Sequence, residues 1–184
     1  MPDALTGRLL VATPLLDEPN FRRAVVFVCS HTDDGAFGVI LNRPLEEPVD
    51  EQLPDWARRT DVPHVFFSGG PVDPDRVIAL ALNRTGREPQ GWSLVAPEVG
   101  LVDLSMDADE LSPSIEAVRL FSGYAGWGGG QLEHEIGEQS WFVVDSRPSD
   151  VFSRTPLDLW RAVLRRQASP LAIYSTFPSD VALN

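Results

Sequence analysis

A glycine-rich segment at residues 121–135 (FSGYAGWGGGQLEHE) constrains the fold more than any other part of this chain. It carries five glycines together with Tyr124 and Trp127. Glycine loses more conformational freedom on folding than any other residue, so such a cluster indicates positive φ angles or a close approach of another group to the backbone. An apolar segment precedes it at 115–121. We therefore predict a strand at 115–121, a glycine-rich turn, and a helix at 130–137.

Short apolar segments separated by turn residues make up most of the remaining chain, a pattern typical of strands. Residues 24–30 (AVVFVCS) and 36–42 (AFGVILN) flank the turn HTDDG, which predicts a hairpin. Both segments are almost continuously apolar, so we expect both faces of the hairpin to be covered. Many strands with few helices predict an α+β domain, with helices packed on a mixed sheet. Further strands are predicted at 8–13, 64–72, 76–82, 92–96, 100–106 and 141–145, and a short helix at most around 50–58.

A second helix is predicted from residue 155 to about residue 167. Thr155 is the expected N-cap and Pro156 the first helical residue. Three arginines near its C-terminus, Arg161, Arg165 and Arg166, are interpreted as a solvated helix face rather than a nucleic-acid contact. The expected apolar stripe of this helix consists of Leu157, Trp160, Val163 and Leu164.

Length and composition favour one domain over residues 1–184. No apolar run approaches the roughly 20 residues that a membrane-spanning helix needs, and the first residues lack the order of a signal peptide. A single cysteine, Cys29, excludes an internal disulfide framework. We interpret the chain as a soluble cytoplasmic protein without a membrane partner.

The charged residues exclude several function classes. The formal net charge is −12, and all fifteen basic residues are arginines. A P-loop needs a lysine at the phosphates, and Schiff-base chemistry needs a lysine amine, so neither is available to this chain. The acidic balance disfavours direct nucleic-acid binding, which depends on neutralising phosphates.

Several motifs together resemble the AlgH/YqgE family of uncharacterised bacterial proteins. The strongest are GYAGWG at 123–128 and GQLE at 130–133, supported by GAFG at 35–38, NRP at 42–44 and GGPV at 69–72. The resemblance covers nearly the whole chain. It implies a single compact domain with a bifurcated, barrel-like mixed β-sheet flanked by helices. Members of this family carry a transcriptional-regulator label, and the resemblance implies no established reaction.

Two interpretations of the glycine-rich turn remain open. In the first, backbone N–H groups at the helix start form a ligand cradle with Trp127 or Tyr124 as a wall. In the second, the turn is a tight packing joint with Trp127 filling the core. Gln131 stands where a dinucleotide fingerprint needs glycine or alanine, and Glu133 in the first helical turn would repel phosphate.

Cys29 and His31 form the second candidate site. Residues i and i+2 share a face of a regular strand, so a thiolate–imidazole pair oriented by Asn42 is one hypothesis. The favoured interpretation is structural, with Cys29 as a small buried apolar residue. The histidines lie in unrelated segments without HExxH or paired CxxC spacing, and we predict neither a metal site nor a cofactor.

The leading functional hypothesis is a protein that binds a small ligand or a protein partner beside the turn at 123–130. One alternative is a hydrolase-type enzyme using Cys29 and His31, and the other is an indirect transcriptional regulator. We expect Gly126 and Gly128 to border a solvent-reachable pocket. The candidate ligand-binding residues are Arg23, His31, Asn42, Arg43, Gly123, Tyr124, Gly126, Trp127, Gly128 and Gln131.

Overall fold

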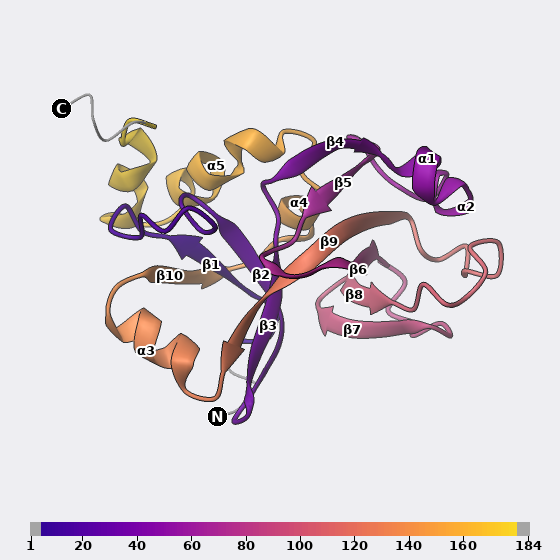
Figure 1. Cartoon of the computed structure of the whole chain (residues 1–184), viewed down its shortest axis with the longest axis horizontal. Helices are drawn as coiled ribbons and strands as arrows, with labels where there is room; N and C mark the ends of the chain where they lie inside the picture. Colours follow the sequence, from indigo (N-terminus) through magenta and orange to yellow (C-terminus); the bar gives the residue numbers. More distant parts are fainter. Residues whose placement is uncertain (1–4, 180–184) are drawn as a thin grey trace.

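The computed structural model describes residues 5–179 and shows a curled, mainly antiparallel sheet that forms a half-barrel with helices packed on it (Figure 1). The predicted α+β class with a barrel-like mixed sheet is confirmed. Strand order is β10-β1-β2-β3-β9-β6-β8-β7, and β4 and β5 join off this path. The strands are β1 (Arg8–Ala12), β2 (Val25–Thr32), β3 (Gly35–Ile40), β4 (Pro44–Pro48), β5 (Val65–Ser68), β6 (Val72–Leu82), β7 (Trp92–Ala96), β8 (Val99–Val102), β9 (Ala117–Gly128) and β10 (Trp141–Asp145). The helices are α1 (Val49–Gln52), α2 (Pro54–Ala57), α3 (Gln131–Gly137), α4 (Pro148–Val151) and α5 (Leu159–Arg165), with 3-10 turns η1 (Pro156–Asp158) and η2 (Leu171–Thr176).

Strand β9 is the point at which the sheet divides. Its first half pairs with β6 on one edge and, at Phe121 and Ser122, with β5 in parallel on the other. Its last residues pair instead with β3, from Ala125 opposite Gly38 to Gly128 opposite Gly35. Strands β3 and β5 therefore use the same edge of β9 in succession, which gives the mixed, bifurcated sheet that the family resemblance implied.

Both faces of the β1–β2–β3 part of the sheet are covered. In β1, Leu9 and Val11 belong to a core cluster that contains Trp160 of α5, whereas Leu10 and Ala12 belong to a cluster that contains Leu132 of α3. Figure 1 shows α5 and α3 on opposite sides of these strands. The nearly continuous apolar sequence of β1 and β2 follows from this double burial.

The main correction to the predicted fold concerns β9. The strand does not end at residue 121 but continues through the glycines to Gly128, so the turn is confined to Gly129 and Gly130. From Ala125 to Gly128 buried and exposed residues alternate, as in any strand with one covered face. Helix α3 then begins at Gln131, close to the predicted start.

The predicted helix at 155–167 is present as η1 followed by α5, but two of its details were wrong. The Thr155 side chain makes no capping hydrogen bond. Leu157 is 78% exposed, because the chain enters α5 through a 3-10 turn that takes this residue off the buried stripe. Trp160, Val163 and Leu164 are buried as expected.

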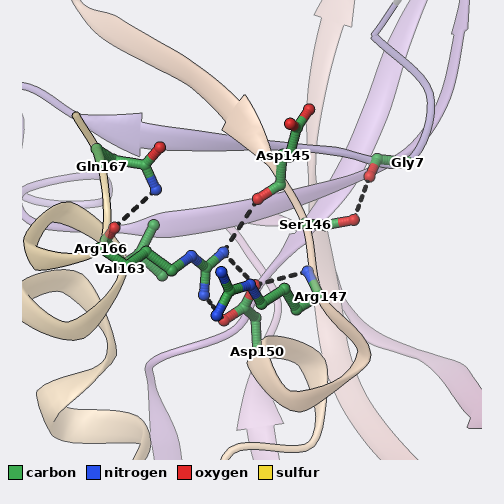
Figure 2. Close-up of polar contacts among 8 residues, drawn as sticks. All are labelled: Gly7, Asp145, Ser146, Arg147, Asp150, Val163, Arg166 and Gln167. Atoms are coloured by element: carbon green, nitrogen blue, oxygen red, sulfur yellow. Dashed lines mark hydrogen bonds and ion pairs between the residues drawn. The ribbon is translucent and has the colours of Figure 1, made fainter.

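A buried ion pair fixes α5 to α4 and β10. The Arg166 guanidinium donates to both carboxylate oxygens of Asp150 and to the carbonyl oxygen of Asp145. Figure 2 shows this fork, with the backbone N–H of Arg147 donating to the same Asp150 carboxylate. The expectation of a solvated arginine face was therefore wrong for Arg166, whose side chain is only 19% exposed. Removing one partner of such a pair typically costs about 3–5 kcal/mol of unfolding free energy.

Within residues 5–179, the helices are all too short or too polar to cross a membrane.

Candidate functional site

The glycine-rich segment and α3 are joined by a closed hydrogen-bond network. The indole N–H groups of Trp127 and Trp141 both donate to Oε2 of Glu135, each at 2.9 Å. Gln131 donates from Nε2 to Oε1 of Glu135 at 3.0 Å, and its own Oε1 accepts the backbone N–H of Gly128 at 3.0 Å. Each of these polar groups is therefore already engaged within the protein, which favours the packing-joint interpretation for Trp127 and Gln131.

His31 belongs to the same joint. Its Nε2 lies 2.6 Å from Oε1 of Glu133, and its ring is buried. A hydrogen bond from the backbone N–H of Glu133 and a second from His31 lower the pKa of the Glu133 carboxyl. Nδ1 of His31 is buried and has no hydrogen-bond partner among the described residues. The His31–Glu133 contact thus ties the β2–β3 hairpin to α3.

The glycine content of the segment has a direct cause at Gly123. This residue has φ +73°, and a Cβ placed there would lie 2.6 Å from the carbonyl oxygen of Gly70. Gly70 packs equally close in return, since its own Cβ would meet the backbone of Tyr124 at 2.2 Å. The two glycine-rich motifs therefore pack backbone against backbone, with no room for a side chain at either position.

Gly126 and Gly128 differ from Gly123, because both are exposed and have space for a side chain. A Cβ at Gly126 would lie 3.4 Å from Cε2 of the Tyr124 ring. A Cβ at Gly128 would approach no atom closer than 3.9 Å. Close packing accordingly does not explain these two glycines, and Gly126 lies beside Tyr124.

Tyr124 lines an open groove of about 540 Å³. The neighbouring β9 residues Ala125 and Trp127 belong to the core beneath α3, whereas Tyr124 packs with the opposite core cluster. Its ring meets Phe37 edge to face, with centroids 6.1 Å apart. The remaining lining residues come from β6, β8 and the loop after β8: Arg76, Val77, Ile78, Ala79, Leu101, Val102, Asp103, Leu104 and Ser105.

Two charged side chains line the groove without an ion pair to each other. Arg76 is exposed, and within residues 5–179 it forms no ion pair or side-chain hydrogen bond. The carboxylate of Asp103 accepts the backbone N–H of Ser105 at 2.9 Å. Hydrogen bonds from the Ser105 side chain and backbone lower the pKa of Asp103. The groove thus offers an apolar surface together with one unpaired guanidinium and one ionised carboxylate.

The predicted residues Arg23, Asn42 and Arg43 lie in a third place, at the loop before β2. Asn42 accepts the backbone N–H of Val25 at 2.9 Å and donates to the carbonyl oxygen of Arg23 at 2.8 Å. Arg43 donates to carbonyl oxygens of the same loop. The Arg23 guanidinium lies over the Trp160 ring, 4.3 Å from its centroid. The three residues hold the loop in place and line no part of the Tyr124 groove.

Cys29 and His31 are not brought together as a catalytic pair. The β2–β3 pairing shifts register between Val28 and Ser30, which makes Cys29 the extra residue of a β-bulge. Cys29 packs in the core cluster of Trp160, whereas His31 turns to α3. Burial raises the pKa of the Cys29 thiol to about 12, so the thiolate needed for nucleophilic attack is scarce near neutral pH.

Sequence reasoning missed the groove residues Phe37, Arg76, Asp103 and Ser105. They come from three separate segments, and although Phe37 stands in the GAFG motif, nothing in the sequence links these segments to one another. The available signal was Tyr124 itself, an aromatic residue between glycines. Among residues 5–179, no three His, Cys, Asp or Glu side chains are grouped so that they could hold a metal ion.

A family described as AlgH-like matches residues 9–172 of the chain. This protein belongs to the AlgH-like family. Its sequence is 50% identical to the UPF0301 protein SCO2948 of Streptomyces coelicolor, over 98% of this chain and 96% of that protein. The family name carries no assigned reaction, in agreement with the sequence-based expectation.

Two solved structures share the AlgH-like fold. The crystal structure of protein DIP2367 from Corynebacterium diphtheriae has a TM-score of 0.90 and 33% identity, with 96% of this chain and 93% of that chain covered. The solution structure of the AlgH protein from Pseudomonas aeruginosa has a TM-score of 0.70 and 26% identity, with 96% and 95% covered. This chain therefore shares its fold with both of these proteins.

Proposed function

We propose that this AlgH-like protein binds a small organic molecule in the groove lined by Tyr124. The groove itself supports this proposal, because its volume of about 540 Å³ falls within the roughly 300–1,000 Å³ typical of small-molecule sites. Phe37, Ile78 and Tyr124 supply an apolar surface for the body of such a molecule. Of the predicted site residues the proposal retains Tyr124, whereas Gly126 and Gly128 are not among the residues that line the groove.

The charges at the groove favour a molecule with an anionic group. Arg76 presents a guanidinium with five N–H donors, and no described residue pairs with its side chain. Asp103, in contrast, already accepts hydrogen bonds from Ser105. An aromatic or aliphatic carboxylate would place its apolar part on Tyr124 and its charge at Arg76.

Three probes that share one phenyl group test this proposal: phenylacetate, phenylalanine and phenethylamine. We expect phenylacetate to shift the backbone amide signals of β6 and β9 in NMR spectra in a saturable manner, and phenethylamine to have the weakest effect. Arg76→Gln should weaken phenylacetate binding, while Arg87→Gln, at an arginine whose side chain is also exposed and unpaired among the described residues, should leave it unchanged. Absence of saturable shifts with all three probes, or equal binding of the anion and the cation, would contradict the proposal.

No observation favours the hydrolase or the indirect-regulator alternative. The hydrolase hypothesis needs a reactive Cys29–His31 pair, and these residues face different parts of the core. We retain a cytoplasmic location as part of the proposal, on the strength of the single buried cysteine and the acidic composition.

A further inference from the structure

A second, smaller cleft of about 120 Å³ lies where the loop before β2 meets α5 and residues 177–178. It shares no lining residue with the Tyr124 groove. Figure 1 shows this loop beside α5 and the C-terminal segment. Asp17, Arg22, Arg23, Trp160 and Phe177 are the lining residues on which its chemistry depends.

Positive charge gathers at this cleft on a chain whose formal net charge is −12. Arg23 donates to the carbonyl oxygens of Phe177 and Pro178. Arg161, next to Trp160 in α5, donates to the carbonyl oxygens of Ser175 and Phe177 at 2.7 and 2.9 Å. Among the described residues neither guanidinium is paired with a carboxylate. Carbonyl oxygens satisfy N–H donors but leave the positive charge in place.

These like charges affect one another. Burial lowers the pKa of Arg23, and the charges of Arg161 and Arg22 lower it further. Trp160 holds the Arg23 guanidinium by a cation–π contact at 4.3 Å, and the indole is itself fixed by a 2.9 Å hydrogen bond to the carbonyl oxygen of Ala12. The cationic group is therefore held in position at a site where an anion would relieve repulsion.

Asp17 is the one carboxylate among residues 5–179 that lines the cleft. Its Oδ1 lies 3.5 Å from Nε of Arg22, and the two side chains are 78% and 43% exposed. Exposed ion pairs of this kind contribute little to stability. A doubly charged oxyanion would therefore compete well with Asp17 for Arg22, since guanidinium forks match the geometry of phosphate oxygens.

We propose that this cleft binds one phosphate-sized oxyanion between Arg22 and Arg23. A volume of about 120 Å³ is well below the roughly 300–1,000 Å³ typical of small-molecule sites, which suits a single phosphate group rather than a nucleotide. The phosphate is either free inorganic phosphate or the terminal group of a small phosphomonoester whose remainder lies outside the cleft.

Titration of the full chain at low ionic strength tests the proposal, with inorganic phosphate and glycerol 3-phosphate as separate probes. We expect saturable NMR shifts at the Trp160 indole and the backbone of residues 17–23. Arg22→Gln and Arg23→Gln should each weaken phosphate binding about tenfold or more. Arg165→Gln, at an exposed arginine of α5, should change the affinity for phosphate by less than about twofold. Tighter binding of glycerol 3-phosphate would identify a phosphomonoester, and equal binding would identify free phosphate.

Asp17→Asn is expected to raise the affinity for phosphate, a result that a purely structural role of the arginines does not predict. Removing the competing carboxylate should tighten phosphate binding several-fold, and the substitution lies at an exposed position that does not threaten the fold. The proposal is overturned if neither the natural chain nor Asp17→Asn shows saturable shifts up to about 10 mM phosphate. Equal weakening of phosphate binding by Arg165→Gln and Arg23→Gln would overturn it too.

Discussion

The two faces of β9 differ in how their polar groups are satisfied. On the face toward α3, the indole of Trp127 donates to Glu135, and the side chains of Gln131 and Trp141 donate hydrogen bonds to the same carboxylate. On the face toward the groove, the Tyr124 ring contacts Phe37, but its hydroxyl has no hydrogen-bond partner among the described residues. One strand thus carries a closed joint on one side and an open surface on the other.

This difference changes the meaning of the sequence motif. Most conspicuous members of GYAGWG and GQLE, including Trp127, Gln131 and Glu133, are used to attach α3 to the sheet. A motif that identifies a family is therefore largely structural here. The residues available for binding are the less conspicuous ones on the other face, above all Tyr124.

The largest expected change in stability comes from Gly123→Ala, which tests whether β9 needs its close backbone contact with Gly70. Gly123→Ala places a Cβ at φ +73° and 2.6 Å from the carbonyl oxygen of Gly70, so we expect a loss of about 3 kcal/mol or more of unfolding free energy. Gly126→Ala, three residues along the strand, should change it by less than about 1 kcal/mol, because a Cβ fits there. Urea denaturation measures both. Equal effects would mean that the glycines are interchangeable strand residues.

The closed face is tested by Glu135→Ala. This change removes the acceptor of two buried indole N–H groups, and we expect it to lower the free energy of unfolding by about 2–3 kcal/mol. The matched control is Glu138→Ala at the exposed C-cap of the same helix, with an expected effect within about 0.5 kcal/mol. If the two variants were equally stable, the network around Trp127 would not be what holds α3.

The sequence was sufficient to predict the hairpin, the doubly covered strands and the α+β class, because these depend on local apolar patterns. It was also right that the glycines mark a close backbone approach, as Gly123 shows. The end of β9 was predicted wrongly, since glycine was taken as a turn signal. In fact Ala125–Gly126–Trp127–Gly128 has strand alternation, with glycine in the exposed positions.

The candidate site was less predictable, for two physical reasons. A one-residue bulge at Cys29 changes the face to which His31 belongs, and no local sequence signal marks such a bulge. The groove depends on where β8 and the following loop lie against β6 and β9, which is decided by long-range pairing. Arg76 and Asp103 therefore could not be associated with Tyr124 beforehand.

The contribution of Glu133 to stability can be distinguished by its dependence on pH. Because the pKa of Glu133 is lower in the folded than in the unfolded chain, its ionised form stabilises the fold above the unfolded pKa of about 4.3. This stabilisation is lost as the pH falls through the lower, folded pKa. We expect the difference in unfolding free energy between the natural chain and Glu133→Gln to be present at pH 6 and to vanish toward the acid limit. A difference independent of pH would show that the contact with His31 needs no charge on Glu133.

The smallest expected effect concerns the open face. Tyr124→Phe removes a hydroxyl that is bonded to no described residue, so we expect the free energy of unfolding to change by less than about 0.5 kcal/mol. Trp127→Phe is the counterpart on the closed face, and it should cost about 2 kcal/mol or more, because it deletes the donor to Glu135 and leaves space in the core. Chemical denaturation of both variants compares the faces directly. If Tyr124→Phe also weakened phenylacetate binding at unchanged stability, the hydroxyl would be kept for a bound molecule rather than for the fold. A stability loss as large as that of Trp127→Phe would instead show that the Tyr124 face is closed as well.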